Sequence, residues 1–92
     1  MKKIVIDRYI PYDGDPFEGI ARLVPLAPSE ITPEAVRDAD AMVVRTRTRC
    51  DRRLLEGSAV KFISTATIGT DHIDLPWCAT NGITKFSAPG FN

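Results

Sequence analysis

Short apolar runs that alternate with short capped helical segments constrain the fold of this chain more than any other feature of its sequence. The runs are rich in β-branched residues, as is typical of strands buried on both faces of a sheet. They occupy residues 3–7, 21–26, 41–45, 60–65 and 83–88. Strands that alternate with helices are joined by crossover connections and form a parallel sheet. The pattern therefore predicts an α/β domain with a flavodoxin-like parallel sheet of about five strands, in the order 2-1-3-4-5, flanked by helices.

Four segments between the runs carry signals for the start or the end of a helix. The predicted N-caps are Asp15, Thr32, Asp51 and Asp74. The second helix should end near Ala39, and Gly57 and Gly82 should end the third and the fourth. Pro25 favours an edge position for the second strand. No linker, repeat or low-complexity tract interrupts the pattern, so residues 1–92 are expected to form one domain.

The composition argues against several classes of function. Lys and Arg number 12, as do Asp and Glu, so no net charge draws the chain to nucleic acid or to an anionic membrane. No uncharged run is long enough to span a bilayer, and the N-terminus lacks the apolar stretch of a signal peptide. Two cysteines and one histidine make no metal-binding pattern and predict free thiols in a reducing cytoplasm.

Arginines and threonines alternate directly after the third predicted strand, in the sequence VVRTRTRC. They are Arg45, Thr46, Arg47, Thr48 and Arg49. Ligands of parallel sheets bind at the carboxyl ends of the strands, and guanidinium groups suit phosphate and carboxylate groups. If the chain stays extended, the arginines share one side and the threonines the other. The alternative is a solvated run of charges that pairs with nearby carboxylates, those of Asp38, Asp40 or Asp51.

The loop after the fourth predicted strand, in the sequence STATIGTDHID, also suits an anion. Gly69 permits a tight turn that offers backbone N–H groups. Threonine hydroxyls could add hydrogen bonds, from Thr65, Thr67 and Thr70. His72 is either a general base or, in the alternative interpretation, a structural histidine beside Asp71 and Asp74. The two neighbouring strand ends together would form a site for a small oxyanion-bearing molecule.

Taken in order, these segments resemble the D-2-hydroxyacid dehydrogenases over essentially all 92 residues. The element G-x-D-x-x-D at residues 69–74 resembles the whole family. The arginine run, the loop at residues 64–74 and the sequence NGITKFSAPGFN resemble the branch that acts on 4-phosphoerythronate. The resemblance implies the N-terminal, incomplete part of a substrate domain. The enzyme would oxidise the 2-hydroxyl of 4-phospho-D-erythronate with NAD, in pyridoxal phosphate synthesis.

The resemblance also implies roles for individual residues. Thr46 and Thr67 would bind substrate, and the backbone amides around Ile68 and Gly69 would face its carboxylate. Physical reasoning adds Arg45 and Arg47 as phosphate partners. The NAD-binding Rossmann domain and the catalytic Arg, Glu and His would lie downstream, since no G-x-G-x-x-G occurs in these residues. The chain alone is therefore expected to be inactive, and the full-length enzyme to be a cytoplasmic homodimer.

Other proteins with this predicted sheet order fit less well. A receiver domain needs clustered acids after strands one and three, and a flavodoxin needs a hydroxyl-rich loop after strand one; neither occurs here. A non-catalytic protein stays open as the alternative: a remnant that binds a small phosphorylated or carboxylate anion, or an oligomeric partner. A reading frame that continues into a G-x-G-x-x-G would favour the enzyme.

Overall fold

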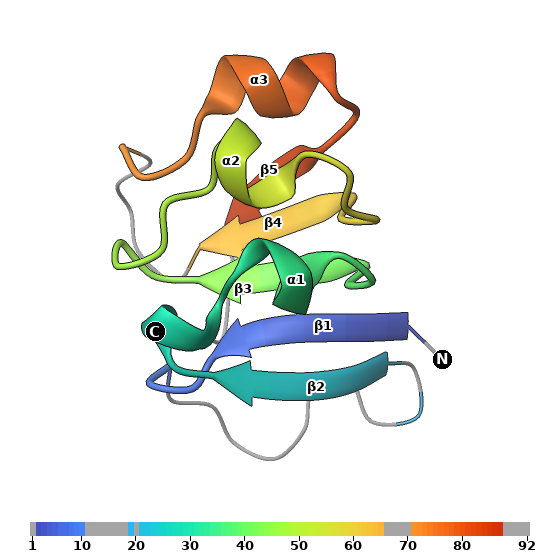
Figure 1. The fold of residues 1–92 in the computed structure, drawn as a ribbon, viewed down its shortest axis with the longest axis vertical. Coiled ribbons are helices and arrows are strands. Elements are labelled where there is room, and N and C mark those ends of the chain that lie inside the picture. Colours follow the sequence, from blue (N-terminus) through green and yellow to red (C-terminus); the bar gives the residue numbers. More distant parts are fainter. Residues whose placement is uncertain (1, 11–18, 20, 66–70, 88–92) are drawn as a thin grey trace.

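The computed structural model describes residues 2–10, 19, 21–65 and 71–87, and these residues contain one parallel sheet. Its strand order is β2-β1-β3-β4-β5 (Figure 1). The strands are β1 (Lys2–Asp7), β2 (Ala21–Leu26), β3 (Ala41–Val44), β4 (Phe62–Thr65) and β5 (Thr84–Ser87). The predicted fold class and strand order are confirmed, and β2, which contains Pro25, lies at an edge of the sheet.

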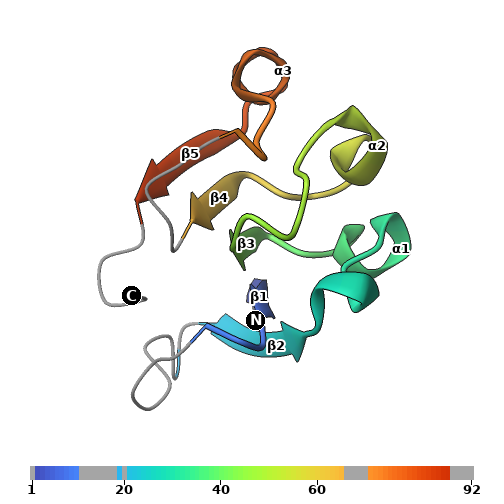
Figure 2. The same ribbon diagram turned by 90° about the vertical axis from the view of Figure 1, so that its left-hand side faces the viewer.

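The helical elements within the described residues lie on one face of this sheet, as Figure 2 shows for α1, α2 and α3. They are η1 (Pro28–Glu30), α1 (Pro33–Val36), α2 (Arg52–Leu55) and α3 (Leu75–Thr80). The helix predicted after Asp15 falls outside the described residues. Each of the described helices is short, so its position depends on its caps and on packing rather than on helix propensity.

The predicted caps are found at the three described α-helices. The side chains of Thr32, Asp51 and Asp74 accept hydrogen bonds from backbone N–H groups in the first turns of α1, α2 and α3. At the end of α3, Gly82 has a φ of +73°. The amide of Ile83 donates to the carbonyl of Cys78 at 2.9 Å, which closes the helix in the manner of a Schellman motif. These signals are local, which explains why the sequence alone reveals them.

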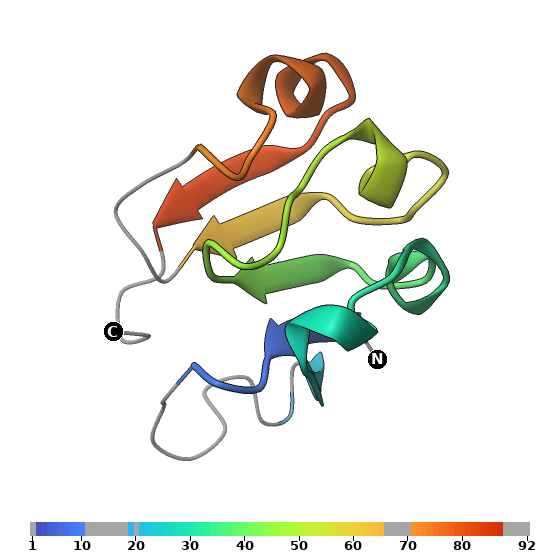
Figure 3. The ribbon, with the colours of Figure 1, turned by 60° about the vertical axis from the view of Figure 1, so that its left-hand side comes forward.

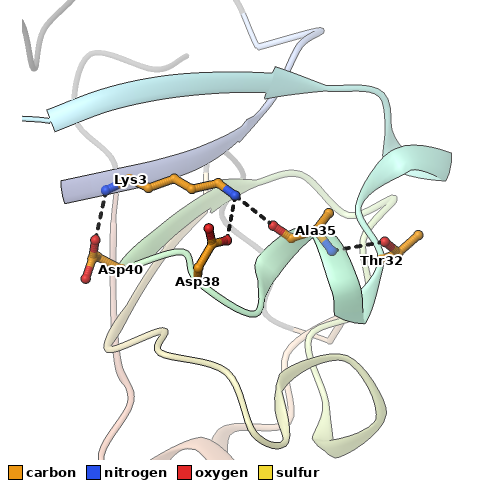
Figure 4. A network of polar contacts seen from close by, with 5 residues as sticks. All are labelled: Lys3, Thr32, Ala35, Asp38 and Asp40. Carbon is orange, nitrogen blue, oxygen red and sulfur yellow. Dashed lines mark hydrogen bonds and ion pairs between the residues drawn. The ribbon is translucent and has the colours of Figure 1, made fainter. Parts of the chain in front are cut away.

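Helix α1 ends at Val36, earlier than the predicted end near Ala39, because β1 fastens the chain at this point. The Nζ group of Lys3 donates to the carbonyl of Ala35 at 3.2 Å and to the carboxylate of Asp38 at 2.7 Å (Figure 4). The backbone amide of Lys3 donates to Asp40 at 2.8 Å. The ion pair lowers the pKa of the exposed Asp38 carboxyl. These contacts turn the chain back into β3.

Two hydrophobic clusters lie on opposite sides of the sheet, because alternate residues of a strand point to opposite faces. The larger cluster packs between the sheet and the described helices and includes Val5, Met42, Val44 and Ile63. The smaller cluster is formed by Ile4, Ile6, Ile10, Ala21 and Val43. Phe62 shares the face of the smaller cluster and is 48% exposed. Ser64, two residues further along β4 on the same face, is buried.

Candidate functional site

The carboxyl ends of the strands lie along one edge of the sheet, where the arrowheads in Figure 3 gather. The segment after β3 and the segment before α3 are joined there by an isolated parallel bridge between Cys50 and Ile73. The amide of Cys50 donates to the carbonyl of His72 at 2.7 Å, and the amide of Asp74 donates to the carbonyl of Cys50 at 2.9 Å. The bridge holds together the two segments that were predicted from the sequence to form one site.

The segment after β3 does not stay extended, so the condition under which its three arginines would share one side is not met. The amide of Thr48 donates to the carbonyl of Arg45 at 3.2 Å, which closes a turn over residues 45–48. Thr48 is buried and Thr46 is exposed, so the two threonines do not have the same environment. The physical reason is the bridge, because the chain must bend after Val44 for Cys50 to reach Ile73.

Arg45 is anchored by a carboxylate at the end of the neighbouring strand β1. Its Nε atom lies 2.9 Å from Oδ2 of Asp7, whose side chain is fully buried. The guanidinium also lies over the ring of Tyr9, 5.4 Å from the ring centroid. Asp7 was not among the partners expected for the arginines. The predicted sheet order could have revealed it, because β1 and β3 are neighbours and Asp7 and Arg45 both stand at their carboxyl ends.

The two remaining arginines of the run behave differently from each other. Arg49 pairs with Asp51, with 3.3 Å between Nε and Oδ2. Asp51 is one of the carboxylates that the alternative of a solvated charge run named as partners. Arg47 is exposed, and no ion pair of its side chain occurs within the described residues. Arg47 is therefore the guanidinium of this run that is available to an anion without breaking an existing pair.

Described residues that were predicted to bind substrate line two different hollows. Arg45 and Arg47 line an open hollow of about 710 Å³, together with Tyr9, Ala27, Pro28 and Ser29. Thr46 lines a second hollow of about 360 Å³, together with Arg49, Asp71 and His72. Among the described residues, none that lines the first hollow is acidic, so this hollow suits an anion on grounds of charge. The predicted residues Thr67, Ile68 and Gly69 lie outside the described residues.

His72 is buried and is held by the end of β4 rather than by the carboxylates beside it in the sequence. Its Nε2 atom lies 3.3 Å from Oγ1 of Thr65, and its Nδ1 atom has no hydrogen-bond partner within the described residues. Burial lowers the pKa of His72, and the charge of Asp71 opposes this shift. Asp74 caps α3 instead of pairing with the ring. The geometry favours a structural role for His72, and Nδ1 is its ring nitrogen without a partner in the described part of the chain.

The two cysteines are free and buried, in accordance with the prediction of free thiols. Burial, together with the nearby Cys78 and Asp51, raises the pKa of Cys50 to about 12. The pKa of Cys78 is also raised by burial. Both side chains therefore stay protonated near neutral pH, and neither is a candidate nucleophile. No cluster of metal-ligating side chains occurs in the described part of the chain, and none of its helices is long and apolar enough to cross a membrane.

Comparison with known proteins gives the family. Residues 4–92 match the catalytic domain of the D-isomer specific 2-hydroxyacid dehydrogenases. The chain belongs to this family. The resemblance seen in its sequence is thereby confirmed, and the parallel sheet described above is that of the family's catalytic domain, as the solved structures below indicate.

Relatives with curated names place the chain close to one branch of the family. It is 57% identical over 91 residues to the erythronate-4-phosphate dehydrogenase of Bacteroides fragilis (strain YCH46), which covers 98% of this chain and 26% of that enzyme. It is 45% identical over 91 residues to the enzyme of the same name from Shewanella oneidensis, of which it covers 24%. The chain thus spans about a quarter of the length of these relatives.

Solved structures of other proteins share the fold of this chain. The NAD⁺-bound 3-phosphoglycerate dehydrogenase of Entamoeba histolytica superposes with a TM-score of 0.73 at 27% identity, over 96% of this chain and 33% of that one. The TT0316 protein of Thermus thermophilus superposes with a TM-score of 0.77 at 20% identity, over 96% of this chain and 30% of that one. The sheet described here is therefore found in both of these solved structures.

Proposed function

We propose that this chain forms the N-terminal part of the substrate domain of an NAD-dependent dehydrogenase that oxidises 4-phospho-D-erythronate at its 2-hydroxyl group. The observation that carries the proposal is the 57% identity to an erythronate-4-phosphate dehydrogenase over 98% of the chain. The hollow lined by Arg45 and Arg47 supports it, because a phosphorylated hydroxy acid brings a dianionic group that guanidinium groups recognise well. Through this activity the protein would serve pyridoxal phosphate synthesis, as a cytoplasmic homodimer.

The proposed substrate has an anionic group at each end, and each of the two segments of the site binds one of these groups. Arg45 and Arg47 bind the phosphate. The backbone amides of Ile68 and Gly69 bind the carboxylate, with hydrogen bonds from the hydroxyls of Thr46 and Thr67. The bridge between Cys50 and Ile73 holds the segment after β3 beside described residues that follow Gly69 in the sequence. Two anion sites at a set distance would select substrates by length.

The residues of this chain do not fit NAD by themselves. Their glycines stand at positions 14, 19, 57, 69, 82 and 90, and no three of them have the spacing G-x-G-x-x-G. In the proposed enzyme the dinucleotide and the catalytic acid and base belong to a further domain, and the residues described here bind and orient the substrate.

Steady-state kinetics of the protein encoded by the complete reading frame test the proposal. NADH formation is followed with 4-phospho-D-erythronate, with non-phosphorylated D-erythronate and with 3-phosphoglycerate as substrates. The expected result is NAD-dependent turnover with the highest kcat/KM for 4-phospho-D-erythronate. Preference for 3-phosphoglycerate would place the protein in another branch of the family. A reading frame without a G-x-G-x-x-G, whose product binds the anion without turnover, would favour the non-catalytic alternative.

A further inference from the structure

Asp7 is a buried carboxylate whose two oxygens are both occupied. Its side chain is fully inaccessible at the end of β1. Its Oδ1 atom accepts a hydrogen bond from the backbone amide of Tyr9 at 2.9 Å, and its Oδ2 atom accepts one from Nε of Arg45 at 2.9 Å. A buried ion pair is weak evidence for a role in stability, because desolvation of the two charges offsets their attraction. The pair therefore calls for another explanation.

The geometry of the pair constrains the guanidinium of Arg45 on two sides. Contact through Nε fixes one edge of the group, and its Cζ atom lies over the ring of Tyr9, 5.4 Å from the ring centroid. The side chain of Arg45 stays 31% exposed, and it lines the open hollow beside Arg47 and Ser29. A planar group held by one edge and by contact with an aromatic ring has its other N–H donors restricted in direction. Such preorganisation lowers the entropy cost of binding an anion.

We propose that Asp7 is a positioning residue that holds Arg45 toward the phosphate of the substrate. Asp7 thereby sets the preference of the enzyme for phosphorylated over non-phosphorylated hydroxy acids. The inference rests on the proposed function and adds to it a residue that does not touch the substrate itself. Contact with the ring of Tyr9 supports the same orientation.

Asp7→Asn in the complete enzyme is the central variant of the test. Asparagine keeps the volume and can still accept the hydrogen bond from the amide of Tyr9, but it loses the charge that holds Arg45. The KM for 4-phospho-D-erythronate is expected to rise about tenfold, as when one charge-assisted contact is lost. The kcat value and the KM for D-erythronate should stay within about twofold of the parent values, since the phosphate is remote from the reacting carbon.

A double-mutant cycle separates positioning from a structural role. Once Arg45→Ala has removed the guanidinium, Asp7→Asn should have no further effect on the KM for the phosphorylated substrate. Asp38→Asn is the matched control, because it breaks the ion pair with Lys3, which lies at the amino end of β1, whereas Asp7 lies at its carboxyl end. This variant should leave both KM values unchanged. If Asp7→Asn does not fold, Arg45→Lys carries the test. Lysine keeps the positive charge but lacks the planar set of N–H donors of arginine. This variant should raise the KM for the phosphorylated substrate alone.

The outcomes distinguish this inference from the proposed function. Absence of dehydrogenase turnover in the parent enzyme would overturn both. Turnover on 4-phospho-D-erythronate with an unchanged KM in Asp7→Asn would overturn the positioning role and leave the proposed function standing. The positioning role would also fail if the effect of Asp7→Asn on KM were as large in the Arg45→Ala background as in the parent.

Discussion

Arg45→Ala and Arg47→Ala should differ sharply in their effect on stability, although the two arginines stand in one run. Removal of the Arg45 side chain leaves the carboxylate of Asp7 buried, with one hydrogen bond and no counter-charge within the described residues. Breaking a fully buried ion pair costs about 3–5 kcal/mol of the free energy of unfolding. The Arg45 side chain is 31% exposed, so water that enters its place offsets part of this cost. We expect a loss of about 2–3 kcal/mol.

Removal of Arg47 leaves no described carboxylate without its partner, and exposed substitutions of this kind change stability by about 0.5 kcal/mol or less. For a domain of this size, each kcal/mol shifts the Tm by about 4–8 °C. Arg45→Ala should therefore lower the Tm by about 10 °C or more, and Arg47→Ala should leave it almost unchanged.

Thermal and urea denaturation, followed by circular dichroism, measure this difference directly. Arg47→Ala serves as the matched control, because it removes the same side chain two residues away. The double variant Asp7→Asn, Arg45→Ala should regain part of the lost stability, since it leaves no uncompensated charge. Equal Tm values for the two single variants would refute the reasoning, because they would mean that the Asp7 carboxylate does not depend on Arg45.

Three further predictions follow from other parts of the molecule. Burial lowers the pKa of His72 in the folded chain, so the unfolded chain binds more protons below about pH 6.5. The free energy of unfolding should therefore fall as the pH drops below about 6.5. His72→Gln should reduce this dependence of the free energy of unfolding on pH. Phe62 is 48% exposed, so the chain should self-associate weakly and independently of salt. Phe62→Lys should reduce the scattered light, and a strictly monomeric parent chain would contradict this prediction. Isothermal titration of the 92-residue chain with NAD should show no binding, and micromolar affinity would contradict the assignment of the dinucleotide to another domain.

Features that depend on neighbouring residues could be predicted from the sequence. The alternation of apolar runs and helical segments indicated the parallel sheet and its order, because crossover connections admit few topologies. The caps at Thr32, Asp51 and Asp74 follow from side chains that bond amides three residues away. The left-handed backbone at Gly57 and Gly82 has the same local origin.

Features that depend on distant residues could not be predicted from the same signals. The early end of α1 follows from contacts of Lys3 with Ala35 and Asp38, which are more than 30 residues away along the chain. The turn that separates the arginines follows from the bridge between Cys50 and Ile73. The ion pair between Arg45 and Asp7 joins residues separated by 38 positions. Charge pattern along the sequence ranks nearby partners first, and here the nearby candidates Asp38 and Asp40 are engaged by Lys3.

An exchange of segments tests most directly whether this chain is the substrate-binding part of an erythronate-4-phosphate dehydrogenase. The chain replaces the matching residues of the Bacteroides fragilis enzyme, with which it shares 57% identity over 91 residues. The exchange enzyme should oxidise 4-phospho-D-erythronate with a kcat/KM within about tenfold of the parent, since related substrate sites differ by a few contacts. It should also lose its preference for the phosphorylated substrate when Arg47→Ala is added. A folded exchange enzyme that binds NAD but turns over D-erythronate and its 4-phosphate equally well, or neither, would contradict the account.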